Sequence, residues 1–179
     1  MKEKDFAKRI EYFLTTHRTK QKCDELAAEV SKNEAYFEVL IDIWKRGNIH
    51  PNYAAWVASH AVMRNEELFK KYGEQLFDFI PHCKTSGEER EILRMAKESE
   101  ISEEWEGKVL DNCLSNIENP AKAIAIHNYS LELLDRFMKR YTELENEILE
   151  IISRNKPHYA VTIQRKIDKL FHKRSSASK

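Results

Sequence analysis

Residues 51–80 read PNYAAWVASHAVMRNEELFKKYGEQLFDFI, and residues 120–151 read PAKAIAIHNYSLELLDRFMKRYTELENEILEI. Pro51, which opens the first stretch, stands 69 residues before Pro120, which opens the second. The residues that match across this interval without a gap are Ala54 with Ala123, Val57 with Ile126, Val62 with Leu131, Phe69 with Met138, Lys70 with Lys139 and Tyr72 with Tyr141. A match of this length predicts that the chain uses one structural module more than once.

Each copy of the module is predicted to be a pair of helices. In the first copy, apolar residues recur three or four positions apart, which is the spacing of one face of an α-helix. Pro51 suits the first turn of a helix, because the N–H that proline lacks has no partner there. This helix is expected to run to about Arg64, and Asn65 is a favourable N-cap for the next one.

The same spacing continues outside the two matching stretches. Residues Lys20–Val30 predict one helix, and Asn33 caps another that ends at Gly47. Residues 86–119 predict a further pair, whose second helix starts at Ser102. The expected buried stripes of these helices are Cys23, Leu26, Ala27 and Val30, then Phe37, Leu40, Ile41 and Trp44, and finally Trp105, Val109, Cys113 and Ile117.

A final helix is predicted to begin at Pro157. A hairpin of about 35 residues cannot bury its own apolar face, so neighbouring hairpins must stack into a continuous core. The sequence therefore predicts an all-α fold, a right-handed α–α superhelix of about five stacked helical hairpins. We expect one domain over residues 1–174 and a short flexible tail at residues 175–179.

Composition limits the alternatives. Four glycines and four prolines in 179 residues leave little material for the turns of an all-β fold. No apolar run approaches the roughly 18–20 residues that a membrane helix needs, and the opening MKEKDFAKRIEYF has no apolar segment of a secretory signal. The three cysteines are odd in number and far apart, which is typical of reduced thiols in a cytoplasmic protein.

The formal net charge of zero conceals an uneven distribution. Residues 1–22 carry seven Lys or Arg against three Asp or Glu, and residues 154–179 carry eight against one. The body between them, residues 23–153, carries fifteen against twenty-six. Such blocks are typical of solvated faces, and they also favour electrostatic contact with an oppositely charged partner.

The stretches YAAWVASHAV, LFDFI, NPAKAIAIHNYSLELLDR and QRKIDKLF place packing residues as HEAT-like repeats do, with a proline-led first helix and a second helix after a brief polar turn. From Tyr53 to Phe171 the chain resembles small bacterial HEAT-like helical-repeat proteins, a group without an assigned activity. Such proteins are sometimes labelled adenylosuccinate lyase. The serine-rich signature loop of that enzyme family is absent from this sequence, so the resemblance implies an α-solenoid and no lyase activity.

No motif for catalysis or for a metal or cofactor is found. The seven histidines include no His-x-x-x-His pair, and His82–Cys83 has no second cluster nearby in sequence. The four glycines are too scattered for a phosphate-binding loop. Cys113 could be a nucleophile, but its apolar stripe favours a buried structural thiol. We therefore expect no cofactor and no enzymatic activity.

Two surfaces are candidates for binding. Tyr53, Trp56, His60 and Arg64 follow at spacings of three, four and four, so they can share one helix face. This face could recognise a peptide or an anionic group through aromatic and cationic contacts, or it could simply pack between hairpins with its charges on an acidic neighbour. The second candidate is a basic surface near the C-terminus, formed by Arg165, Lys166, Lys169, Lys173 and Arg174.

The resemblance also implies that the second helices of the hairpins line the concave side of the stack. These segments, residues 33–46, 66–80, 102–117 and 142–154, hold fifteen acidic residues against six basic ones. The leading hypothesis is a protein-binding or scaffolding module with a basic partner, which includes self-association through the basic C-terminal region. The alternatives are a nucleic-acid-binding or DNA-repair protein of the HEAT-like class, which the acidic body argues against, and an enzyme with a reactive cysteine.

Overall fold

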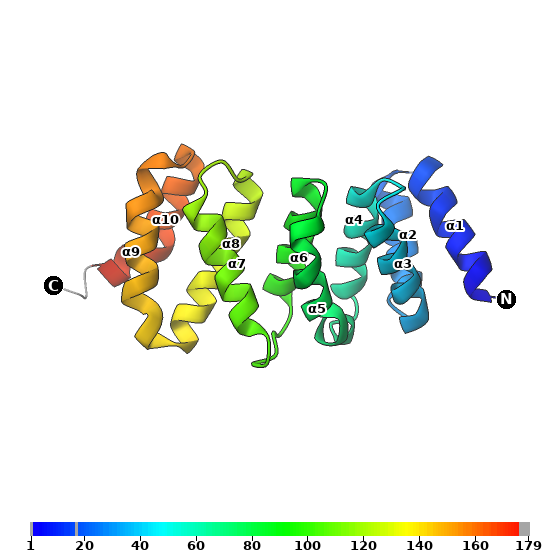
Figure 1. The fold of residues 1–179 in the computed structure, drawn as a ribbon, viewed down its shortest axis with the longest axis horizontal. Coiled ribbons are helices and arrows are strands. Elements are labelled where there is room, and N and C mark those ends of the chain that lie inside the picture. The colour runs from blue at the N-terminus through cyan, green and yellow to red at the C-terminus, as the bar shows by residue number, and fades with distance from the viewer. Residues whose placement is uncertain (1, 17, 176–179) are drawn as a thin grey trace. The chain divides into compact units, whose positions relative to one another are not determined.

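The computed structural model describes residues 2–16 and 18–175 of the chain, and the side chains at residues 5–16 and 18–171. All regular structure in these residues is helical (Figure 1). The helices form two compact units, residues 1–102 and residues 103–179. Unit 1 contains the α-helices α1 (Lys2–Thr16), α2 (Lys20–Val30), α3 (Glu34–Arg46), α4 (Pro51–Val62), α5 (Glu67–Phe79) and α6 (Ser86–Glu98).

Unit 2 contains four α-helices and two of the three described 3-10 turns, η2 and η3. The α-helices are α7 (Glu106–Glu118), α8 (Ile124–Arg140), α9 (Glu145–Asn155) and α10 (Val161–Ser175). The 3-10 turns are η1 (Ile80–His82) in unit 1, and η2 (Thr142–Leu144) and η3 (Lys156–His158) in unit 2. The all-α fold of repeated helices predicted from the sequence is confirmed.

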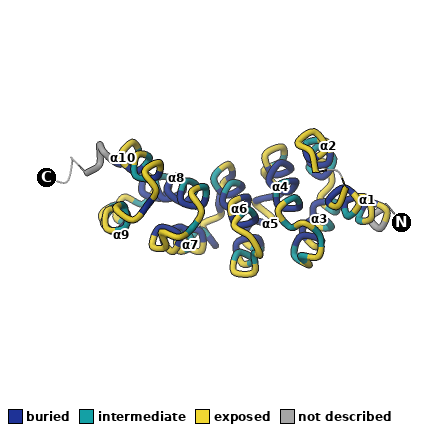
Figure 2. The backbone as a smooth tube through the Cα atoms, turned by 90° about the horizontal axis from the view of Figure 1, so that it is seen from above, coloured by how far each residue is buried: buried dark blue, intermediate teal, exposed yellow. Residues whose placement is uncertain are grey.

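The helices of unit 1 lie in two layers. α4 packs against both α2 and α6, and these three helices form the first layer. α3 packs against α1 and α5, and these three form the second layer. Contacts of α3 and α5 with α4 join the layers, so each consecutive pair of helices after α1 is a hairpin that spans both layers. Figure 2 shows that the buried residues of each helix lie on the side that faces its neighbours.

Unit 2 repeats this arrangement on a smaller scale. α8 packs against α10 in the first layer, and α7 packs against α9 in the second. α8 also packs along α7, and this contact joins the layers. The polar 3-10 turns η2 and η3 lead into α9 and connect it to α10, respectively.

The local signals in the first half of unit 1 act as predicted. The Asn33 side chain accepts a hydrogen bond from the Ala35 N–H at 3.1 Å, which caps α3. Gly47 ends the same helix at a φ of 63°, a left-handed conformation that glycine adopts without strain. Pro51 occupies the first turn of α4.

Two predicted helix starts are wrong. Asn65 does not cap α5, because its amide Nδ2 donates to the backbone oxygen of Ser31 at 2.9 Å, and Glu66 takes the cap position without a side-chain cap bond. Ser102 does not start α7, which begins at Glu106 after a turn. A tertiary hydrogen bond thus overrides the local preference at Asn65.

The two prolines of the second half also fail to start helices. Pro120 lies before α8, which begins at Ile124, and Pro157 lies in the turn η3 before α10 begins at Val161. The 69-residue match is therefore not a match of helix to helix throughout. α8 has 17 residues and α4 has 12, so Tyr141 falls at the C-cap of α8 whereas Tyr72 lies inside α5.

The predicted buried stripes are confirmed. The four residues of the α2 stripe are buried, as are those of α3. Trp105, Val109, Cys113 and Ile117 are buried in unit 2. That residues 1–174 act as one domain stays a prediction, and the predicted tail lies outside the described residues except for Ser175, which ends α10.

Candidate functional site

The structure brings the predicted stripe on α4 together. The ring centroids of Tyr53 and Trp56 lie 6.2 Å apart, and those of Trp56 and His60 lie 5.5 Å apart in an edge-to-face arrangement. One turn further, Arg64 donates from Nη1 to the backbone oxygen of His60 at 2.9 Å. Tyr53 and Trp56 are half-buried and Arg64 is exposed, so one edge of the stripe faces solvent.

An acidic residue of α2 holds the charged end of this stripe. Asp24 lies 2.8 Å from Nδ1 of His60 and accepts a second contact from Nη2 of Arg64 at 3.3 Å. The hydrogen bond from His60, followed by that from Arg64, holds the pKa of Asp24 below its usual value. The His60 ring and the Arg64 guanidinium are therefore both bonded within unit 1.

The other end of the stripe continues onto residues before α4. The Arg18 guanidinium lies over the Tyr53 ring, 5.5 Å from its centroid, and also contacts the His50 imidazole at 3.2 Å. His50 and Tyr53 lie edge to face at 6.2 Å. This end of the patch thus links the segment before α2 to the start of α4.

The predicted basic surface divides into parts that differ in their contacts. Arg165 and Lys169 are exposed on α10, whereas Lys166 is half-buried and forms an ion pair with Glu132 of α8. The side chains of Lys173 and Arg174 lie outside the described residues. Arg165 and Lys169 are therefore the described residues of the predicted basic surface that are exposed and form no ion pair among the described side chains.

Acidic side chains of the second layer line a pocket between α3 and α5. Its volume is about 230 Å³, and its lining residues are Glu38, Ile41, Asp42, Tyr72 and Gln75. Ile41 is buried beneath it, and the carboxylates of Glu38 and Asp42 are exposed one helical turn apart. We call this feature the α3–α5 groove.

Neither carboxylate of the α3–α5 groove forms an ion pair among the described side chains, although the Lys71 ammonium, which pairs with Glu34, also interacts with the charge of Glu38 at longer range. Glu38 accepts one hydrogen bond, from the Tyr72 hydroxyl at 2.7 Å, and the Asp42 carboxylate makes no described hydrogen bond or ion pair. The nearest basic residue of α3, Lys45, instead donates to Gln75 at 2.7 Å. The groove thus presents two exposed carboxylates that form no ion pair, in a lining that is mainly polar.

Tyr72 fixes one side of this groove. Its one hydroxyl proton is shared between Glu38 and Glu34, whose Oε1 lies 2.9 Å away, and burial followed by the bonds to Glu38 and Glu34 raises the pKa of Tyr72. Glu34 is neutralised by an ion pair with Lys71, whose hydrogen bond lowers the pKa of Glu34. The negative charge left in the groove is therefore that of Glu38 and Asp42.

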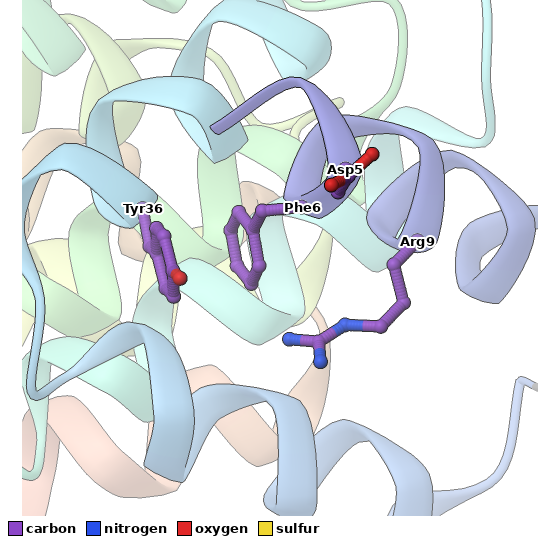
Figure 3. A pocket seen from close by; sticks show the side chains of 4 residues that line it. All are labelled: Asp5, Phe6, Arg9 and Tyr36. Atoms are coloured by element: carbon purple, nitrogen blue, oxygen red, sulfur yellow. The ribbon is translucent and has the colours of Figure 1, made fainter. Parts of the chain in front are cut away.

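A second pocket, of about 240 Å³, lies beside α1 and α3. It is lined by Asp5, Phe6, Arg9 and Tyr36 (Figure 3). The Phe6 and Tyr36 rings stack with centroids 3.7 Å apart, and the Arg9 guanidinium lies 5.1 Å from the Phe6 centroid. These contacts attach α1 to α3, and nothing in the pocket arranges groups for a chemical reaction.

The cysteines and histidines form no metal-binding cluster in the described part of the chain. No group of three His, Cys, Asp or Glu side chains there could hold a metal ion. Burial, followed by the charges of Asp24 and Glu91, raises the pKa of the Cys23 thiol to about 12, which leaves it protonated and unreactive at neutral pH. No described helix is long and apolar enough to cross a bilayer.

Sequence reasoning missed several partners that complete these surfaces. Asp24 lies 36 residues before His60, and Tyr72 lies 34 residues after Glu38, so both contacts span about one hairpin. A search for hydrogen-bonding pairs separated by one repeat would have found them. The groove acids themselves, Glu38 and Asp42, were among the acids predicted on the second helices.

Comparison with known proteins gives one result. A family model described as a HEAT repeat domain matches residues 10–173, which include all helices of both units except the ends of α1 and α10. Searches of the curated proteins and of the solved structures return no match.

Proposed function

Because the chain belongs to the HEAT repeat domain family, we propose that it is a non-enzymatic protein-binding module and that its α3–α5 groove receives a basic side chain of a partner protein. The observation that carries this proposal is the pair of exposed carboxylates, Glu38 and Asp42, neither of which forms an ion pair among the described side chains. A lysine or arginine would supply the missing charge, and a guanidinium could bond both carboxylates.

The dimensions of the groove support a side chain as its occupant. Its volume of about 230 Å³ lies below the roughly 300–1,000 Å³ typical of pockets for drug-sized ligands. The carboxylates of Glu38 and Asp42 and the amide of Gln75 give the groove a mainly polar lining, which suits the charged end of a basic side chain. An extended basic segment of a partner protein fits these features.

The charge of the second layer argues against the nucleic-acid alternative. Duplex and single-stranded nucleic acids require surfaces that neutralise phosphates, whereas the groove carries carboxylates. Among the described side chains of α10, the exposed basic ones are Arg165 and Lys169, without aromatic side chains between them for base stacking. The free cysteines, two of them buried, fit a cytoplasmic location in which thiols stay reduced.

The proposal is tested by titrating the full chain with a fluorescent peptide rich in Lys and Arg, and with an acidic peptide of equal length. We expect binding of the basic peptide alone, weakened as the salt concentration rises from 50 to 300 mM. Glu38→Gln with Asp42→Asn should weaken it about tenfold, which corresponds to roughly 1.4 kcal/mol.

A matched control changes the same amount of charge elsewhere in unit 1. Glu66→Gln with Glu98→Gln alters two acids that line a separate pocket beside Met63. This variant should bind the basic peptide within about twofold of the original protein. Equal losses in both variants would show that the peptide senses only net charge, and binding unchanged by the groove substitutions would refute the proposed site.

A further inference from the structure

A further crevice, with an apolar lining, lies between α1 and α2 at one end of unit 1. Its volume is about 360 Å³. Tyr12, Phe13 and Leu26 supply its apolar lining, and the side chain of Tyr12 is 59% exposed. Its charged rim consists of Arg9, Lys22, Glu25 and Glu29.

The layers of unit 1 show what kind of element would fill this crevice. α4 has a first-layer neighbour on each side, α2 and α6, whereas α2 has a described first-layer neighbour only in α4. α1 belongs to the second layer, and its residues Arg9, Tyr12 and Phe13 line the crevice opposite α2. The crevice therefore lies where the next first-layer helix of a continuing stack would pack, beside α2 and against α1.

α10 has the complementary position in unit 2. It is a first-layer helix that packs on α8, with Ile163, Ile167 and Phe171 buried, and no described second-layer helix follows it. Its opposite face carries Val161, which is 59% exposed, and the exposed cations Arg165 and Lys169. Neither cation has an acidic partner among the described side chains.

We infer that α10 of one copy of this chain docks in the α1–α2 crevice of a second copy, where it completes a helical hairpin with α1. First-layer helices of a repeat stack run parallel to one another, so α10 would run parallel to α2 of the second copy. Arg165 and Lys169 are the fifth and ninth residues of α10. Glu25 and Glu29 are the sixth and tenth residues of α2.

With α10 and α2 parallel and their first residues level, the cations of α10 lie beside the acids of α2. The two cations and the two acids have the same four-residue spacing. Counted from the start of each helix, their positions differ by one residue, or about 1.5 Å along the helix axis. Val161, at the start of α10, would then lie beside the first turn of α2, next to the end of α1 that carries Tyr12. The docked helix thus offers an apolar residue to the exposed tyrosine and two cations to the acidic rim.

The existing ion pairs of the rim do not prevent this contact. Glu25 pairs with Lys22 at 2.5 Å, and both side chains are about half exposed. Glu29 pairs with Arg9, and these side chains are 40% and 55% exposed. Exposed pairs of this kind are weak and rearrange readily, so each carboxylate can accept a further cation.

The inferred contact is heterologous, because it joins different surfaces of the two copies. Two such copies leave one crevice and one α10 open, so association continues beyond a dimer unless it closes into a ring. It uses neither Glu38 nor Asp42, so it stands or falls independently of the groove proposed above. Its dependence on paired charges predicts that it weakens with salt.

Sedimentation velocity of the full chain over a range of concentrations tests the inference. We expect the weight-average sedimentation coefficient to rise with concentration at 50 mM salt and to approach the monomer value at 500 mM. Arg165→Glu with Lys169→Glu should remain monomeric at both salts, and so should Glu25→Lys with Glu29→Lys. A mixture of the two variants should associate again, because each α10 then meets a crevice of opposite charge.

The mixture separates the inferred contact from a general effect of charge or from misfolding. Two damaged proteins would not restore association on mixing. As a control, Lys70→Glu with Lys71→Glu makes the same charge change on α5 and should associate as the original protein does. A monomer at every concentration and salt, unchanged association of either charge-reversed variant, or failure of the mixture would each overturn the inference.

Discussion

Tyr72 and Tyr141 stand 69 residues apart in the two matching stretches, yet they occupy different parts of their hairpins. Tyr72 lies within α5, is 5% exposed, and donates from its hydroxyl to Glu34 and Glu38 of α3. Tyr141 is the half-buried C-cap of α8 and donates to Glu106 of α7. In both stretches the acceptor glutamate lies near the start of a second-layer helix, 34 to 38 residues earlier.

The comparison shows what this repeat preserves. Arg140, beside Tyr141, pairs with Glu103, just as Lys71, beside Tyr72, pairs with Glu34. In both stretches the tyrosine and the cation beside it contact acids near the start of the preceding second-layer helix. The position of the tyrosine differs, because Tyr72 lies inside α5 whereas Tyr141 is the C-cap of α8. This is expected of a stack, in which stability depends on contacts between neighbouring hairpins.

The two units also differ in the polar groups they bury. Unit 1 buries carboxylates: Glu88 accepts from Trp44 Nε1 at 2.9 Å, and Glu91 accepts from Ser59 at 2.6 Å. Unit 2 instead buries neutral groups, among them the Asn116 amide, which donates to Ser130 at 3.2 Å. The interior of unit 1 therefore depends more strongly on charge.

The largest expected difference is between Tyr72→Ala and Tyr141→Ala. Tyr72→Ala removes a buried ring that lies 5.4 Å from that of Phe37, and we expect a loss of about 3–5 kcal/mol of unfolding free energy. Tyr141→Ala removes a half-buried ring and should cost about 1 kcal/mol. Urea denaturation of the full chain measures both losses, and equal losses would contradict the distinction between the two sites.

A smaller difference is expected for the buried polar groups. Glu91→Ala leaves Ser59 and the guanidinium groups of Arg90 and Arg94 without their shared acceptor. Because both arginines are partly exposed and can regain water, we expect a loss of about 2 kcal/mol. Asn116→Ala should cost about 1 kcal/mol. If Asn116→Ala were the more damaging in urea denaturation, the interior of unit 1 would not be the more charge-dependent.

Much of the helical architecture could be predicted because apolar periodicity and caps act locally. The α2 stripe, the Asn33 cap and the Gly47 stop depend on residues within one or two turns. Asn65 and Pro120 could not be placed from such signals. The Asn65 amide donates to the backbone oxygen of Ser31, 34 residues away, and α8 begins four residues after Pro120.

The sequence could predict which residues share a helix face, but not which residues they contact across hairpins. Residue spacing placed Trp56 and His60 on one face of α4, and it placed Glu38 and Asp42 on α3. Only the packed structure shows that Asp24 bonds His60, whereas Glu38 and Asp42 form no ion pair among the described side chains. Contacts between hairpins decide which carboxylates form an ion pair and which do not.

The smallest expected effect concerns alkaline pH. The folded pKa of Tyr72 is raised by burial above the unfolded value of about 10, so its contribution to stability is complete below pH 10 and declines as the pH rises further. Between pH 10 and 11 the original protein should lose up to about 1 kcal/mol more than Tyr72→Phe. Tyr12→Phe, which changes a tyrosine whose side chain is 59% exposed, is the control, and parallel stability curves for the original protein and Tyr72→Phe would contradict this account.

Hydrogen–deuterium exchange of the full chain, with and without the Lys- and Arg-rich peptide at low salt, tests the proposed binding function most directly. The account predicts slower exchange in α3 and α5 when the peptide is bound, with α8 and α9 unchanged. In Glu38→Gln with Asp42→Asn, this protection should largely disappear at the same peptide concentration. Protection confined to other helices, or protection of α3 and α5 that survives both substitutions, would contradict the proposal that the α3–α5 groove is the binding site.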